Sequence, residues 1–222
     1  MAIRAKSQSW QVIGLLVAAI ALWAAERWNP GLLREWRDQP AAQDSPPATE
    51  VSGEPAMVGG YQRYEGCEWV EHRQNDGDSF RLRLPDGRVE QFRLYFADAP
   101  ESAFRTYRQG ATNHQRIHEQ AVDFGVTDAR AVEIGQEAKK KVEALLKDRK
   151  ITLFTEWTDP FKDHRYRAFV AVPGGDGWLH EWLIRHGLAR VHTEGAPLPD
   201  GTPVAKQKRH LKALEKAART TH

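Results

Sequence analysis

The sequence predicts an α+β fold in which a small five-stranded β-barrel carries about three helices, preceded by one apolar N-terminal helix. Two observations predict the barrel. Short segments of alternating apolar and polar residues are separated by tight turns, and a long helical segment divides them into two groups. The resulting order of three strands, helix, two strands and helix is typical of a Greek-key barrel of the OB type, which binds ligands on one open face. A chain of 222 residues is long enough for one such domain plus accessory segments.

The first segment, residues 1–28, contains an apolar run. Residues 7–25 carry no charge, a length close to the roughly 20 residues that span a bilayer as a helix. Arg4 and Lys6 precede the run, and tryptophans near its ends suit the membrane interface. We expect a membrane anchor with the main domain outside the cytoplasm. A cleaved secretory signal, which would release a secreted or periplasmic protein, is the alternative, because residues 19–21 are suited to cleavage.

Residues 29–59 are rich in Pro, Ala, Ser and Glu, and this composition predicts a disordered linker that buries little surface. The folded domain is expected at 60–195, and a basic C-terminal helix at 196–222. The single cysteine, Cys67, excludes an intramolecular disulfide and is expected to be buried as a small hydrophobic residue. The net charge of +2 is too small to indicate nucleic-acid binding by itself, so any function must be argued from a site.

The first three strands of the barrel have separate signals. The segment 65–72 alternates loosely, whereas 79–84 alternates strictly between apolar residues and arginines. The apolar face of this second strand consists of Phe80, Leu82 and Leu84. A turn at 85–87 follows, because its proline fixes φ and its glycine supplies a positive φ. The segment 89–96 is therefore expected to return as the second arm of a hairpin.

After the hairpin, residues 103–120 are polar and show no clear period, so no element is predicted there. Thr127 is expected to cap a helix that runs to about Lys147 and presents apolar residues at helical spacing. The remaining elements are two strands, a short helix, a short strand and a basic helix, at 151–155, 165–172, 178–186, 188–191 and 203–219 respectively. The basic helix is expected to present a solvated face; contact with DNA or anionic lipid is the alternative.

The most informative segment for function is residues 76–101. It contains an acidic turn, Asp76-Gly77-Asp78, then a hairpin with Arg93 on its second arm, then Asp98 and Glu101 on either side of a proline. A hairpin can bring such carboxylates together beside the arginine. A metal-assisted phosphodiester hydrolase needs this combination, because it must activate water and stabilise negative charge on phosphate oxygens.

Five motifs occur in a fixed order across most of residues 65–191: DGDSFRLRL, FRLYFADAPES, GQEAKKKVEALL, RYRAFVAV and WLHEWLIRHGLARV. In this combination the domain resembles the staphylococcal nuclease-like (thermonuclease) family. The resemblance implies an OB-fold barrel that cleaves DNA and RNA with Ca²⁺, or with another divalent ion. Single-stranded or frayed DNA and RNA are the expected partners, together with a membrane bound through the N-terminal helix. No obligate protein partner is evident from the sequence.

The resemblance also assigns roles to residues. Asp78, Asp98 and the carbonyl of Ala99 match the metal ligands, in keeping with the preference of Ca²⁺ for oxygen. Arg93 matches the first phosphate-binding arginine, whose planar fork fits phosphate oxygens. Glu101 matches the catalytic glutamate, usually described as the base for the attacking water.

The second phosphate-binding arginine of the family follows a D-x-Y-G-R pattern, which here is altered to Asp163-His164-Arg165-Tyr166-Arg167. Alignment on the aspartate selects Arg167, whereas alignment on the following strand selects Arg165. Strand register is the stronger constraint, because a one-residue shift exchanges the faces of the sheet. We therefore expect Arg165 to be catalytic, and both arginines to contact the substrate from one face.

Two further alternatives remain open at this point. A non-catalytic OB-fold module that binds nucleic acid or protein at the cell envelope is favoured by the altered segment 163–167. The presence of every predicted acid together with Arg93 favours the hydrolase. Residues 103–134 are longer than the corresponding loop of the type member, so this segment is expected either to narrow the active site or to be a passive insertion.

Overall fold

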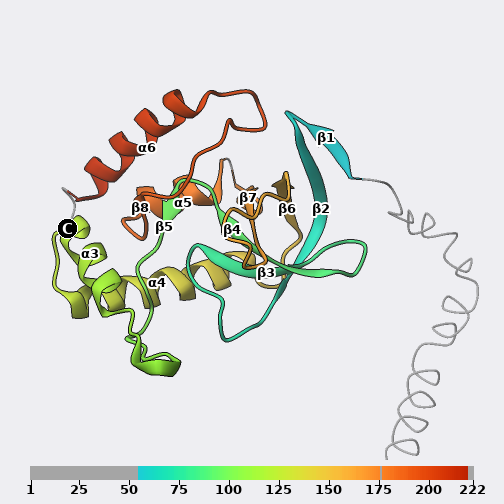
Figure 1. The fold of residues 1–222 in the computed structure, drawn as a ribbon. Helices are drawn as coiled ribbons and strands as arrows, with labels where there is room; N and C mark the ends of the chain where they lie inside the picture. The colour runs from blue at the N-terminus through green and yellow to red at the C-terminus, as the bar shows by residue number, and fades with distance from the viewer. Residues whose placement is uncertain (1–54, 176, 220–222) are drawn as a thin grey trace, which may run out of the picture. The chain divides into compact units, whose positions relative to one another are not determined.

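The computed structural model describes residues 55–175 and 177–219 of the chain (Figure 1). These residues form an α+β domain with a closed five-stranded barrel and four α-helices, which confirms the predicted class and an OB-like barrel. The predicted anchor at 1–28 and most of the predicted linker lie outside the described residues. No helix within the described ranges has the length and apolar character needed to cross a membrane.

The barrel is closed by pairing between its first and last strands. Its five strands, in spatial order, are β2 (Tyr61–Val70), β3 (Ser79–Arg83), β4 (Val89–Leu94), β7 (Arg165–Val170) and β6 (Ile151–Thr155). β6 also pairs with β2, and this pairing completes the ring. The β4–β7 pair is parallel and the other four pairs are antiparallel, so the barrel is mixed.

A short strand, β1 (Ala56–Val58), precedes the barrel and pairs with the beginning of β2. The intervening residues Gly59 and Gly60 have φ of 57° and 91°, as a two-residue hairpin with two positive φ angles requires. The folded domain therefore begins before residue 60, earlier than the predicted boundary. The three residues of β1 are too few for alternation to indicate a strand, although the Gly-Gly pair is a hairpin signal.

The strands enclose an aromatic and aliphatic core that follows the predicted alternation. Phe80, Leu82 and Leu84 are buried as expected, and Arg81 and Arg83 point outward. Other fully or nearly fully buried core residues are Tyr61, Phe92, Leu94, Phe96, Ile151, Leu153 and Phe169. Cys67 is also fully buried, as predicted, and burial raises the pKa of its thiol to about 12. The thiol is therefore protonated at neutral pH and unreactive.

The four helices are α3 (His114–Phe124), α4 (Asp128–Leu146), α5 (Leu179–Arg185) and α6 (Val204–Arg219). A 3₁₀ turn, η1 (Arg108–Gly110), precedes α3. Thr127 caps α4 as predicted, because its hydroxyl accepts a hydrogen bond from the Arg130 amide at 3.2 Å. The prediction of about three helices omitted α3. Its apolar positions Ile117, Ala121 and Phe124 do fall at helical spacing, but they are few in an otherwise polar segment.

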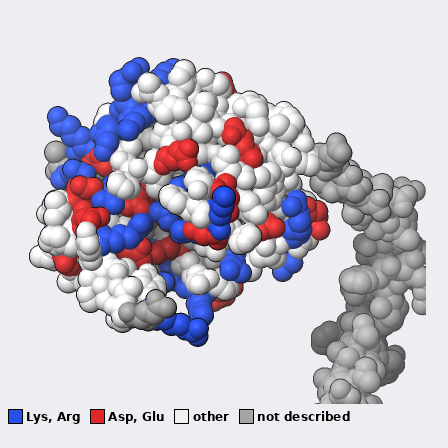
Figure 2. All heavy atoms as spheres, in the orientation of Figure 1, with Lys and Arg blue, Asp and Glu red and all other residues white. Residues whose placement is uncertain are grey.

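A second, two-stranded sheet connects the two halves of the sequence beside the barrel. β5 (Ala97–Asp98) pairs with β8 (Arg190–Val191), with Asp98 opposite Arg190. α6 packs against α5 and buries Leu211 in the core. The basic side chains of α6 stay exposed, as expected, and Lys and Arg gather along this helix in Figure 2.

Candidate active site

An open pocket of about 590 Å³ brings most of the predicted site residues together. Its lining includes Asp78, Arg93, Ala99, Glu101 and Arg165, all of which were expected from the sequence. The segment after β5 and α3 contribute three more lining residues, Arg105, Tyr107 and Arg116. The segment 103–134 is therefore not a passive insertion, because it forms part of the pocket wall.

Asp76 shapes the acidic turn, as predicted. Its amide donates to the carbonyl of Ser79 at 2.7 Å, and its carboxylate accepts from the Gly77 amide at 3.0 Å. The same carboxylate also lines the pocket. Burial, together with the negative charge of Asp78, raises the pKa of Asp76 to about 7. Asp76 is thus a carboxyl that can hold a proton near neutral pH.

α4 packs closely against the acidic turn at Gly77 and against the backbone of Pro100 and Glu101, because a glycine lies at each contact. A Cβ at Gly77 would lie 2.7 Å from the Cβ of Ala138 in α4. A Cβ at Gly135 in α4 would lie 2.4 Å from the carbonyl oxygen of Pro100 and 2.6 Å from that of Glu101. All three distances are shorter than any normal contact, so these positions require glycine. The backbone that carries Glu101 therefore rests directly on the helix.

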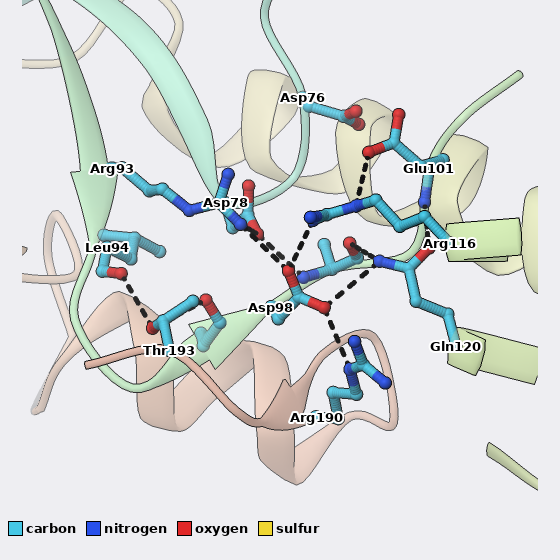
Figure 3. Close-up of polar contacts among 12 residues, drawn as sticks. Asp76, Asp78, Arg93, Leu94, Asp98, Glu101, Arg116, Gln120, Arg190 and Thr193 are labelled. Carbon is cyan, nitrogen blue, oxygen red and sulfur yellow. Dashed lines mark hydrogen bonds and ion pairs between the residues drawn. The ribbon is translucent and has the colours of Figure 1, made fainter. Parts of the chain in front are cut away.

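Asp98 lies at the centre of the site with no exposed side-chain surface, and four donors surround its carboxylate (Figure 3). Oδ1 accepts from Nη2 of Arg93 at 2.9 Å and from Nη2 of Arg116 at 2.8 Å. Oδ2 accepts from Nε2 of Gln120 at 3.1 Å and from Nε of Arg190 at 2.9 Å. Burial opposes ionisation of Asp98, but the positive charges of Arg116 and Arg93 outweigh it and lower the pKa. Asp98 is therefore a fixed negative charge.

Asp78 is the neighbouring acid, and Arg93 connects it to Asp98. Oδ2 of Asp78 accepts from the Ala99 amide at 3.0 Å and lies 3.2 Å from Nη2 of Arg93. Burial raises the pKa of Asp78, Arg93 opposes that rise, and the charge of Asp98 adds to it. In this arrangement Arg93 neutralises two aspartates while still lining the pocket.

Glu101, the expected base, is held by two residues of α3 and by the residue that precedes this helix. Its amide donates to Oε1 of Gln120 at 3.0 Å, and its Oε1 lies 2.8 Å from Nε of Arg116. Nδ2 of Asn113 donates to its Oε2 at 3.4 Å. The Glu101 side chain remains 19% exposed, so a water molecule in the pocket can reach it.

Sequence reasoning missed Asn113, Arg116, Gln120 and Arg190. The first three lie at spacings of three and four residues, so that Asn113 at the N-cap of α3 and the helical residues Arg116 and Gln120 are on one side. A polar stripe at helical period was the available signal, but its meaning depends on knowing that the stripe faces acids. Arg190 is 92 residues from Asp98 in sequence, and only the β5–β8 register brings them together.

Arg165 and Arg167 lie on one face of the sheet, as predicted. The register of β7 beside the parallel strand β4 shows that this is also the face of Arg93. Gln91 is opposite Arg165, and Arg93 is opposite Arg167. Arg165 lines the pocket, where its Nε donates to Asp163 at 2.8 Å. The pocket therefore contains Arg165 together with Arg93, the pair that strand alignment selected.

Arg167 is 4% exposed and has a different environment. Among the described residues, its Nε and Nη1 atoms have no hydrogen-bond partner. Nε lies 4.0 Å from a carboxylate oxygen of Glu194, and the guanidinium lies 5.7 Å from the ring centroid of Phe161. Burial and the charge of Arg93 lower the pKa of Arg167. Arg167 is thus a buried cation with unused donors.

The predicted ligand set for Ca²⁺ consists of Asp78, Asp98 and the Ala99 carbonyl. A carboxylate offers about four lone-pair sites, and the four donors around Asp98 occupy them. The Ala99 carbonyl accepts from Gln120 at 3.1 Å. Within residues 55–175 and 177–219, no group of three or more His, Cys, Asp or Glu side chains is arranged to hold a metal ion. The ligand set does not fit a calcium ion as it is arranged, and calcium dependence stays a prediction.

Comparison with known protein families finds none that matches the chain, and comparison with curated proteins finds no match either.

Proposed function

We propose that this chain is a hydrolase that cleaves phosphodiester bonds in DNA, RNA or both, as the resemblance to the staphylococcal nuclease-like family implies. The observation that carries the proposal is the pocket in which the partly exposed carboxylate of Glu101 lies among arginines. The arginines that line this pocket are Arg81, Arg93, Arg105, Arg116 and Arg165.

This arrangement meets the two demands of phosphodiester hydrolysis. A phosphodiester is an anion and repels a nucleophile, so catalysis needs positive charge at the non-bridging oxygens. Arg93 and Arg165 supply that charge from neighbouring strands, with geometry suited to phosphate. Catalysis also needs a base for water, and Glu101 has an accessible carboxylate beside the same space.

The reaction then proceeds as one displacement. The oxygen of a water molecule attacks phosphorus while Glu101 accepts a proton from it, and the bond from phosphorus to the leaving oxygen breaks. The leaving oxygen takes a proton from solvent, so the products are a phosphate monoester and a free hydroxyl group. Ca²⁺, or another divalent ion, is the cofactor that the resemblance implies, and the assay below measures whether it is needed.

The pocket is open and polar, with Tyr107 among its lining residues, and this suits an extended single strand or a frayed end. We further propose that the enzyme acts outside the cytoplasm, either tethered by its N-terminal segment or released after cleavage of that segment. The alternative function is a non-catalytic nucleic-acid- or protein-binding module at the cell envelope. One observation favours it, since Arg93 is already engaged by two aspartates.

The test is a cleavage assay of the full-length chain, purified in mild detergent, on end-labelled single-stranded DNA and RNA with Ca²⁺ or with chelator. Glu101→Gln should lower turnover by roughly 10²–10⁴-fold, while binding of the same oligonucleotides stays within a few-fold of wild type. Glu133→Gln is the matched control, because Glu133 lies exposed on α4 and pairs with Arg130. Binding without cleavage by the folded protein under every condition would reject the hydrolase and support the binding module.

A further inference from the structure

Arg116 joins the buried aspartate of the site to the expected base. Its Nη2 lies 2.8 Å from Oδ1 of Asp98, and its Nε lies 2.8 Å from Oε1 of Glu101 (Figure 3). Both ion pairs are short, as charge-assisted hydrogen bonds are. The side chain is 43% exposed and lines the pocket, so the same guanidinium is accessible to a phosphate group.

α3 is built into the site and holds Arg116 in place. Ile117 and Gln120 are fully buried, which fixes the helix against the domain. The Gln120 side chain donates to Asp98 and to the Ala99 carbonyl, and it accepts from the Glu101 amide. These three contacts of Gln120 hold α3 against the acid cluster. Arg116, one turn earlier in the same helix, is therefore positioned beside Asp98 and Glu101.

The same contacts oppose binding of a divalent ion. A calcium ion needs free oxygen lone pairs at about 2.3–2.6 Å, and Asp98 has donors at all four of its positions. An ion beside Asp98 would also be close to the positive charges of Arg93, Arg116 and Arg190. A metal ion can coordinate Asp98 only if one of these donors leaves, and Arg116 is the most exposed of them, at 43% against 11% for Arg93 and 6% for Arg190.

We propose that Arg116 takes the place of a divalent cation in this active site, so that phosphodiester cleavage by this chain needs no metal ion. The inference rests on the proposed function. Arg116 neutralises Asp98, fixes the carboxylate of Glu101 and donates to a non-bridging phosphate oxygen as negative charge develops there. It is a catalytic residue that the substrate touches, supplied by a helix that the sequence pattern did not indicate.

Two measurements on the full-length chain test this proposal. In the first, wild type should cleave oligonucleotides at the same rate in EDTA and in millimolar Ca²⁺. Arg116→Ala should lose roughly 10²–10³-fold in turnover in EDTA, the usual cost of removing one donor to a developing charge. Arg116→Lys keeps the positive charge but lacks the planar guanidinium, so its loss of turnover should be smaller than that of Arg116→Ala. Arg130→Ala, at an exposed arginine of α4, should behave as wild type.

The second measurement is Ca²⁺ binding, followed by calorimetry and by the melting temperature. Wild type and Arg130→Ala should not respond to millimolar Ca²⁺. Arg116→Ala should bind Ca²⁺ and melt at a higher temperature with it, because the substitution removes one positive charge and one of the two donors on Oδ1 of Asp98. This readout does not depend on catalysis, and the wild-type result does not depend on whether a variant folds.

The outcomes separate the two proposals. Wild-type cleavage that EDTA abolishes and Ca²⁺ restores would overturn the role of Arg116 and leave the hydrolase intact. Folded wild type that cleaves nothing, with or without Ca²⁺, would reject the hydrolase. In that case the Ca²⁺-binding measurement still tests whether Arg116 excludes the ion from Asp98. If wild type bound Ca²⁺ as tightly as Arg116→Ala does, the inference would be overturned.

Discussion

Substitution of Gly135 by alanine is expected to displace the loop that carries Glu101. The added Cβ would lie 2.4 Å from the carbonyl oxygen of Pro100 and 2.6 Å from that of Glu101. Carbon–oxygen contacts in proteins are normally about 3.3–3.6 Å, so the two groups must separate by about 0.7–1.2 Å. Both neighbouring atoms belong to the backbone, so no side-chain rotation can relieve the contact.

The size of the effect follows from that displacement. A misplacement of about 1 Å at a catalytic group lowers turnover on the order of 100-fold. Overpacking costs about 1–3 kcal/mol of unfolding free energy, and alanine recovers about 1 kcal/mol over glycine within a helix. The net loss of stability should therefore be about 0–2 kcal/mol. Gly135→Ala is expected to damage activity much more than stability.

Turnover in the oligonucleotide assay and urea unfolding, measured on the same preparations, check this expectation. Gly125→Ala is the matched control, because Gly125 has φ of 70° and nothing within 4 Å of an added Cβ. Alanine in this left-handed conformation should lower the unfolding free energy by about 1–2 kcal/mol, while turnover is retained. If Gly135→Ala lost no more turnover than Gly125→Ala, the close support of the Glu101 loop by α4 would be refuted.

Three further predictions concern His180 and the two arginines of β7. Burial lowers the pKa of His180 from its ordinary 6.5 to about 3, so only the unfolded chain takes up this proton between those pH values, and stability falls as pH falls. From about pH 7 to about pH 5 the unfolding free energy should fall by about 2 kcal/mol because of His180. Urea unfolding of His180→Phe should lack this part of the pH dependence, and an equal pH dependence of the two proteins would contradict the prediction. For the arginines, Arg165→Ala should lower turnover more than Arg167→Ala, because Arg165 lines the pocket, and the opposite ranking would favour alignment on the aspartate. Arg167→Met should raise the unfolding free energy by about 1–2 kcal/mol in urea, since it removes buried donors without partners.

The parts of the fold that were predicted are those with a local signal. The period of two in β3 and the proline–glycine turn after it indicate a hairpin without any knowledge of the rest of the chain. The same hairpin brings Asp78 close to Arg93, so this half of the site was predictable from one short segment. Asp98 and Glu101 were recognised as a second acidic cluster of the same segment, and the resemblance to the staphylococcal nuclease-like family then assigned their expected roles.

The parts that were not predicted depend on distant partners. α3 directs polar side chains toward a buried acid cluster, and its short apolar stripe of Ile117, Ala121 and Phe124 stands in an otherwise polar segment. Arg116 and Gln120 have a meaning only once Asp98 is known to lie opposite them. The hairpin of β1 was missed for a simpler reason, since a three-residue strand offers too few positions for a pattern.

The contact of β8 with α6 determines when the site can be completed during synthesis. Arg190 in β8 pairs with Asp98, and the amide of the next residue, Val191, donates to Glu215 of α6 at 2.8 Å. The acids near residue 98 therefore depend on a helix close to the C-terminus, a contact of very long sequence separation. A chain in which β8 has not yet been synthesised lacks Arg190, so Asp98 is then without one of its counter-charges. Because β8 is in turn bonded to α6, the surroundings of Asp98 are complete only after both elements have folded.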